Sequence, residues 1–220
     1  MDFPTLNKDK NTMHFVLILN SYKIKKKMER KMKKQFDKQS NLNTSMDSTI
    51  LWTFQNQNAI NTLLNEGKLI ADPIFVSKEG CTAYKYIVRH MKQKGIDFII
   101  DFPIWAWHSC NGYQKKPTFE TARELLSDIQ LEKEIYLIEF TCPNFLFMLT
   151  NYSGWCDIYF KLTGNPKASV TNDEEKHLFD LYPIIEEEWE YHHIQATLPY
   201  LKKEWIIQIT ELSKINGFNK

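Results

Sequence analysis

The sequence has few glycines, no closely spaced cysteines and no long apolar run. Seven glycines among 220 residues are too few for a phosphate-binding loop, and no P-loop or G-x-G-x-x-G string is present. The cysteines Cys81, Cys110, Cys142 and Cys156 form no C-x-x-C pair, so neither a zinc ribbon nor a thioredoxin-like motif is expected. We expect reduced, buried thiols in a cytoplasmic protein.

The longest apolar run near the N-terminus is Phe15–Leu19, far shorter than the roughly 20 residues that a membrane span needs. Polar residues and lysines follow it, rather than the small residues of a cleavage site. We therefore expect no membrane segment and no export signal.

Charge is balanced over the whole chain but not along it. Residues 1–45 hold 11 basic and 4 acidic residues, a net charge of +7, whereas residues 46–220 carry −6. The polar run Ser40–Ser45 is typical of a linker. We expect a basic leader or arm over residues 1–45 and a globular domain over residues 46–220.

Within the leader, Lys23–Lys38 is predicted to be a basic helix with one narrow apolar stripe. The stripe residues recur every fourth position: Ile24, Met28, Met32 and Phe36. Three interpretations remain open. The segment is an arm that binds nucleic acid or another anionic surface, a solvated helix packed by its stripe, or an extension before a natural start at Met46.

After Met46, strand and helix patterns alternate without the regular spacing of βαβ units. The predicted strands are Ile50–Gln55, about 103–108, Glu134–Thr141 and Ile194–Leu198, and Trp205–Leu212 fits a strand or a helix. The predicted helices are Asn56–Glu66, Lys78–Lys94, Thr118–Ser127, Gly154–Leu162 and, broken at Pro183, Glu174–His193. Pro143–Tyr152 is predicted as helix or loop. The pattern favours an α+β fold with mixed or antiparallel sheets and flanking helices.

Aromatic residues give the main candidate site. Trp105 and Trp107 lie two apart on a predicted strand, so they face the same side. They belong either to a thick aromatic core or to the wall of a pocket for a planar ligand. His108 follows them and is the histidine with a candidate site role. Glu188 and His192 share a predicted helix face, but no third ligand is evident, so no metal site is predicted.

Several short strings between residues 46 and 212 match one known family. They are Leu51–Gln55, Gly67–Leu69 with Asp72, Ala83-Tyr84, Pro103–Trp107, Trp189, Ile194–Ala196 and Glu204–Ile206. With these strings the chain resembles a bacterial family known as domain of unknown function 3841. Pro103–Trp107 is the most specific string. The resemblance implies no particular activity.

More distantly, the layout resembles ADP-ribosyltransferase-like folds, such as RNA 2′-phosphotransferases and DNA-targeting ADP-ribosylating toxins. In those folds a first strand carries a polar residue that contacts NAD, and a closing strand carries the catalytic glutamate. Here Thr53 stands where His or Arg is usual, and Gln195 stands where Glu is usual. The resemblance implies Thr53 and Gln195 as the catalytic positions of a degenerate site with NAD as its cofactor, or a role for a carboxylate within Glu186–Glu190.

Three functions therefore stay open. The first is a module of unknown activity whose aromatic pocket binds a ligand or partner. The second is an ADP-ribosyltransferase-like effector, of toxin or phage-defence type, that binds NAD or another nucleotide. The third is a nucleic-acid-associated protein acting through Lys23–Lys38. The ligand-binding candidates are Gln55, Tyr84, Trp105, Trp107 and His108, and whether the protein is an enzyme is undecided.

Overall fold

The computed structural model describes residues 47–97, 101–183 and 186–214. The predictions for the basic leader, including the helix over Lys23–Lys38 and the linker over Ser40–Ser45, lie outside these residues. No helix among the described residues is both long and apolar enough to cross a membrane.

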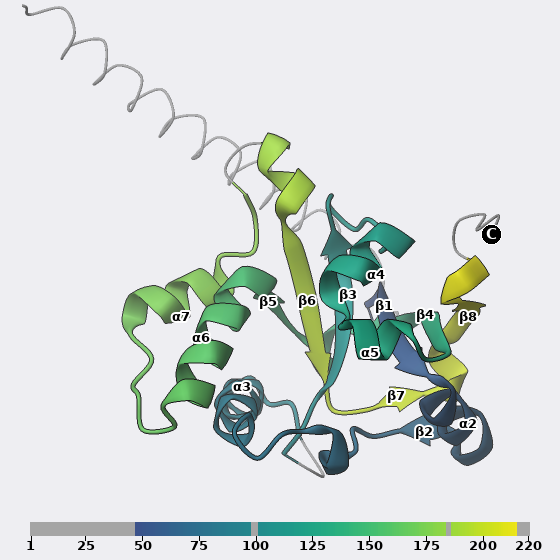
Figure 1. Cartoon of the computed structure of the whole chain (residues 1–220), viewed down its shortest axis with the longest axis horizontal. Helices are drawn as coiled ribbons and strands as arrows, with labels where there is room; N and C mark the ends of the chain where they lie inside the picture. The colour runs from purple at the N-terminus through teal and green to yellow at the C-terminus, as the bar shows by residue number, and fades with distance from the viewer. Residues whose placement is uncertain (1–46, 98–100, 184–185, 215–220) are drawn as a thin grey trace, which may run out of the picture. The chain divides into compact units, whose positions relative to one another are not determined.

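A six-stranded sheet organises the described residues, with the strand order β5-β6-β3-β1-β4-β8 (Figure 1). Its strands are β1 (Ser48–Asn56), β3 (Ile104–Cys110), β4 (Ile135–Pro143), β5 (Met148–Asn151), β6 (His193–Leu198) and β8 (Ile206–Glu211). All five neighbouring pairs in this sheet are antiparallel. A separate two-stranded sheet pairs β2 (Lys68–Leu69) with β7 (Leu201–Lys202). The predicted α+β class is confirmed.

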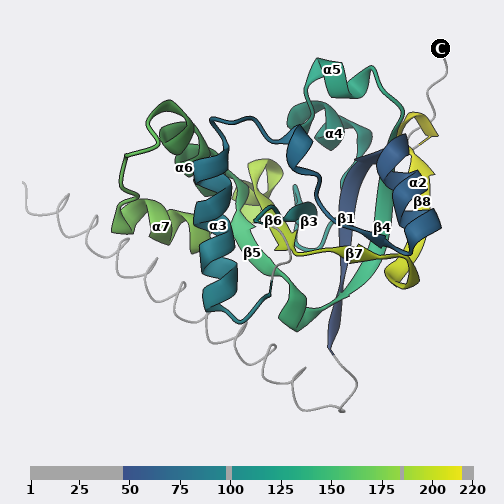
Figure 2. The ribbon, with the colours of Figure 1, turned by 90° about the horizontal axis from the view of Figure 1, so that it is seen from below.

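Six α-helices flank the sheet among the described residues. They are α2 (Gln57–Glu66), α3 (Cys81–Gln93), α4 (Phe119–Leu125), α5 (Asp128–Leu131), α6 (Tyr152–Gly164) and α7 (Asn172–Phe179). Short 3-10 turns are η1 (Pro73–Phe75), η2 (Asn144–Leu146), η3 (Glu186–Tyr191), η4 (Lys203–Trp205) and η5 (Leu212–Lys214). Figures 1 and 2 show α3, α6 and α7 grouped at the β5 side of the sheet, with α2 at the opposite side.

Helix α2 shows how local sequence sets an element's limits. The side chain of Asn56 caps the helix by accepting a hydrogen bond from the backbone N–H of Ala59 at 2.9 Å. Gly67 ends it with a φ of 76°, a left-handed conformation that glycine adopts without a steric penalty. Ile60 and Leu63 form its buried face. The helix predicted over Asn56–Glu66 is confirmed.

Three segments differ from the sequence-based prediction. Pro143–Tyr152 was expected to be helix or loop, but it contains strand β5, which is only four residues long and is defined by its pairing with β6. The helix predicted over Thr118–Ser127 ends at Leu125, because Ser127 caps the following helix α5. Glu174–His193 is divided into α7, capped by Thr171, and the separate turn η3.

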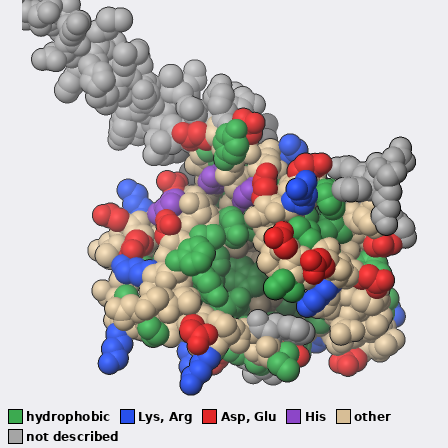
Figure 3. Space-filling model, in the orientation of Figure 1, with side chains coloured by type: hydrophobic (Ala, Val, Ile, Leu, Met, Phe, Trp, Pro, Cys, Tyr) green, Lys and Arg blue, Asp and Glu red, His purple; other side chains and the backbone are tan. Residues whose placement is uncertain are grey.

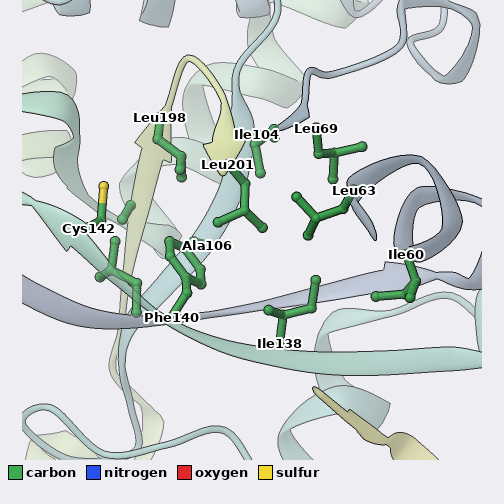
Figure 4. Close-up of a cluster of buried hydrophobic side chains, with 12 residues drawn as sticks. Ile60, Leu63, Leu69, Ile104, Ala106, Ile138, Phe140, Cys142, Leu198 and Leu201 are labelled. Carbon is green, nitrogen blue, oxygen red and sulfur yellow. The ribbon is translucent and has the colours of Figure 1, made fainter. Parts of the chain in front are cut away.

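The sheet buries both of its faces. One face packs against α2 and the small sheet, and we call it the α2 face. Figure 4 shows its core, a buried cluster in which Ile104, Ala106, Ile138 and Phe140 of the sheet occur together with Leu63 of α2. The opposite face, which we call the α6 face, carries the residues that alternate with these along the same strands. The candidate site lies on the α6 face.

Candidate functional site

One row of side chains crosses the whole sheet on the α6 face. Directly opposed residues of antiparallel strands share a face, and the strand registers link six of them in sequence. From β5 to β8 they are Thr150, Gln195, Trp107, Trp52, Glu139 and Gln208. We call this set the cross-sheet row. It places two tryptophans at the centre, with polar side chains on both sides.

The central tryptophans are covered by the neighbouring helices. Trp52 and Trp107 are only 6% and 8% exposed, and they form a buried cluster against which Leu125 of α4 and Tyr152 of α6 pack. The ring centres of Trp107 and Tyr152 lie 5.2 Å apart in an edge-to-face arrangement. Figure 3 shows hydrophobic side chains gathered in a hollow between α6 and α4, the two helices that cover this cluster.

The aromatic wall continues from the row toward α3. The rings of Trp105 and Trp155 lie 4.7 Å apart, and Tyr84 meets Trp105 edge-to-face at 5.9 Å. Burial is the main cause that raises the pKa of Tyr84, so its phenol stays protonated at neutral pH. Trp105 and Tyr84 are both partly exposed. The wall is therefore aromatic, and some of its rings are partly open to solvent.

The β5 end of the row contains two buried polar atoms that have no hydrogen-bond partner among the described residues. Gln195 is 2% exposed and Thr150 is fully buried, yet Gln195 Nε2 and Thr150 Oγ1 are both unpaired. The next threonine on β6, Thr197, donates to the carbonyl of Met148 at 3.2 Å. An unpaired buried polar group costs about 1–3 kcal/mol, so two neighbouring ones call for an explanation.

Toward the other end of the row, the carboxylate of Glu139 accepts hydrogen bonds from two side chains. Trp52 Nε1 donates to Oε2 of Glu139 at 3.0 Å, and Lys116 Nζ reaches the same oxygen at 2.8 Å. The hydrogen bond from Lys116 is the main cause that lowers the pKa of Glu139, so this side chain is charged at neutral pH. Sequence reasoning missed Glu139. The sequence feature that could have revealed it is a single carboxylate in a mostly apolar strand, two residues after Leu137 and therefore on the same face as Leu137.

His193 and Cys110 face each other on β6 and β3 at the edge of the same aromatic cluster. His193 Nε2 lies 3.7 Å from a carboxylate oxygen of Glu124, while burial lowers the pKa of the imidazole. Burial also raises the pKa of the Cys110 thiol, so this cysteine is not a thiolate at neutral pH. Among the described residues, no group of three or more His, Cys, Asp or Glu side chains could hold a metal ion.

The structure divides the sequence-predicted site residues between two faces. Gln195 and Trp107 are neighbours in the cross-sheet row, and Trp105 and Tyr84 extend the same aromatic wall. Thr53, by contrast, alternates with Trp52 and lies on the α2 face opposite Ile138. The structure thus brings together four of the seven candidates.

The remaining candidates make local contacts elsewhere. Thr53 is fully buried, and its hydroxyl donates to the carbonyl of Trp105 at 2.7 Å and accepts from Gln55 Nε2 at 2.9 Å. His108 occupies a register shift in β3, where its Nδ1 lies 2.8 Å from Ser109 Oγ. Burial lowers the pKa of His108 to about 4, so it is neutral at physiological pH. Glu188 and Glu190 are exposed in η3.

Comparison with known proteins gives a family and no relative of known activity. No curated protein and no solved structure matches the chain. The family model described as domain of unknown function (DUF3841) matches residues 50–165, a stretch that begins in β1 and ends just after α6. Since the match covers more than half of the 220 residues, the chain belongs to the DUF3841 family.

Proposed function

We propose that this protein is a binding domain whose α6 face accommodates a small ligand with a planar ring. The observation that carries the proposal is the pair of unpaired, buried polar atoms, Gln195 Nε2 and Thr150 Oγ1, beside an aromatic wall. Small-molecule sites typically combine apolar and aromatic walls with a few placed polar groups. Such groups gain their hydrogen bonds when the ligand arrives.

The polar atoms limit the chemistry of the ligand. An amide N–H of Gln195 requires an acceptor, whereas the hydroxyl of Thr150 can donate or accept. The partly exposed rings of Trp105 and Tyr84 offer edges and faces for a planar ring. The ligand that fits best is an aromatic heterocycle carrying a carbonyl or ring nitrogen. The buried Trp52 and Trp107 then serve as the support beneath it.

A pair of matched variants tests this proposal. Nicotinamide, adenine and NAD would be titrated into the protein, with tryptophan fluorescence and the melting temperature as readouts. Gln195→Met should weaken binding about ten-fold, since one hydrogen bond is worth about 1 kcal/mol and more when its partner is left buried. Thr49→Val removes a hydroxyl from the opposite face, where it donates to Asn144, and should leave affinity unchanged. Equal affinity for both variants, or binding of none of the three probes by folded protein, would reject the proposal.

NAD binding by an ADP-ribosyltransferase-like domain is the second candidate. It is supported by the cross-sheet row, in which Trp52 of the first strand and Gln195 of the closing strand flank Trp107 on one face. The position of Thr53 on the other face weakens the part of the resemblance that gives it a catalytic role. Gln195 lacks the charge that would stabilise a cationic transition state, so we expect slow or no NAD consumption.

Restoring the carboxylate tests this second candidate. Gln195→Glu is nearly isosteric and should raise NAD turnover if the row is a degenerate transferase site. NAD consumption would be followed for both proteins, with circular dichroism as the check on folding. If the folded variant is as inactive as the original protein, the transferase hypothesis is rejected and ligand binding remains the only proposed function. The third open function, nucleic-acid binding through Lys23–Lys38, rests on residues outside the description and stays a prediction.

A further inference from the structure

A second concave surface lies away from the cross-sheet row, between α3 and the segment that joins α6 to α7. This groove has a volume of about 510 Å³, within the range of about 300–1,000 Å³ typical of small-molecule sites. Thr82, Lys85 and Arg89 line it from α3, and Ser169 lines it from the joining segment. Figures 1 and 2 show α3, α6 and α7 side by side around this region. We call it the α3–α6 groove.

The α3 side of the groove carries two cationic side chains without an ion-pair partner among the described residues. Lys85 and Arg89 are four residues apart on one helix face, and both are exposed. Neither forms an ion pair with a carboxylate among the described residues. Lys85 and Arg89 also line a neighbouring groove of about 470 Å³. In that groove Lys92 differs from them, because it pairs with Asp101 at 2.8 Å.

The acidic residue in the α3–α6 groove is already engaged. Glu175 accepts a hydrogen bond from the hydroxyl of Tyr86 at 2.9 Å, and its carboxylate lies 3.5 Å from His90 Nε2. Burial and this hydrogen bond raise the pKa of Tyr86, so its phenol remains a donor. The guanidinium of Arg89 lies over the Tyr86 ring, 5.1 Å from its centre. This contact places the Arg89 guanidinium over the Tyr86 ring at the groove.

Donors and an apolar wall occur together in the groove. The hydroxyls of Thr82 and Ser169 line the groove together with the two cationic side chains, while the partly exposed Ala168 and Val170 supply apolar surface. A guanidinium fork, an ammonium and hydroxyl donors match the oxygens of a phosphate group. We propose that the α3–α6 groove binds a small organic phosphate, with its phosphate at Lys85 and Arg89 and its apolar part against Ala168 and Val170.

The test is a titration of full-length protein with phenyl phosphate and with inorganic phosphate, followed by calorimetry at fixed ionic strength. Phenyl phosphate should bind more tightly, because its ring adds contact with the apolar wall. Lys85→Gln and Arg89→Gln should each weaken binding about ten-fold, as expected for loss of one charge-assisted hydrogen bond. Lys176→Gln makes the same charge change on the exposed face of α7, outside the groove, and should have no effect.

Two further variants sharpen the outcome. Glu175→Gln removes the nearest opposing charge and should strengthen binding, provided that circular dichroism shows an unchanged fold. Gln195→Met should not alter phenyl phosphate affinity, because the groove is separate from the cross-sheet row. Equal weakening by Lys176→Gln would show non-specific charge attraction and overturn the proposal. Full affinity in both the Lys85 and Arg89 variants, or no preference for phenyl phosphate over inorganic phosphate, would overturn it as well.

Discussion

Replacing Thr150 by valine should stabilise the domain, although the residue is fully buried and central to the proposed site. Its Oγ1 has no hydrogen-bond partner in the described part of the chain, so the folded protein carries the desolvation cost of a hydroxyl without compensation. Valine has nearly the same shape and favours strands. Removing the cost should raise the free energy of unfolding by about 1–2 kcal/mol.

Thr197 provides the matched control on the neighbouring strand. It is also fully buried and lies opposite Met148 in the register, but its hydroxyl donates to the Met148 carbonyl at 3.2 Å. Thr197→Val therefore removes a satisfied hydrogen bond and leaves an acceptor without its partner. It should lower the free energy of unfolding by about 1 kcal/mol. The two threonines share residue type, burial and sheet face, so the sign of the effect depends on the hydrogen bond alone.

Urea unfolding of the ligand-free protein measures both effects. The midpoint should shift up for Thr150→Val and down for Thr197→Val, with the slope unchanged because the surface exposed on unfolding is the same. Each kcal/mol corresponds to about 2–4 °C in melting temperature for a domain of this size. A destabilised Thr150→Val would refute the reasoning, since it would mean that Oγ1 has a partner in the ligand-free protein, such as a buried water.

Three other predictions concern packing and charge. A Cβ at Gly154 would lie 2.8 Å from backbone atoms of Leu178, so Gly154→Ala should separate α6 from α7 and cost about 1–3 kcal/mol in a urea titration. Trp107→Ala should cost about 3–5 kcal/mol, because the ring is 8% exposed in the core, and an unchanged melting temperature would refute this. The lowered pKa of Glu139 means that its contribution to stability is present above the ordinary glutamate pKa of 4.5 and is lost as pH falls below it. Lys116→Gln should flatten that acid dependence of the urea midpoint, and identical pH profiles would contradict the assignment.

Much of the fold could be read from local sequence. The cap residues Asn56 and Gly67 fixed helix α2, and alternation correctly placed Trp105 and Trp107 on one side of β3. Strand β5 could not be predicted, because four residues show no clear period and its existence depends on pairing with β6. The division of the helix predicted over Glu174–His193 is only partly visible in sequence, at Pro183.

The candidate site was predictable in its residue types but not in its geometry. Alternation alone separates Thr53 from Trp52, yet it cannot say which of the two shares a face with Gln195. That depends on the register that sets Trp52 against Trp107 and Trp107 against Gln195. Glu139 is part of the site through its pairing with Trp52. It is the single carboxylate in β4, but that local signal does not show which side chain it faces on the next strand.

The sequence left open whether the tryptophans form an aromatic core or the wall of a pocket, and the structure contains both kinds of tryptophan on one face. Trp52 and Trp107 are too buried to form a ligand-contacting wall, whereas Trp105 and Tyr84 are partly exposed and pack against Trp155 of α6. A buried aromatic core and a more accessible aromatic surface therefore lie on the same face of the sheet. Core packing does not account for the polar side chains within the row. Gln195 Nε2 and Thr150 Oγ1 weaken the fold where they lie, and under the proposed binding function the ligand supplies the hydrogen bonds that offset this cost.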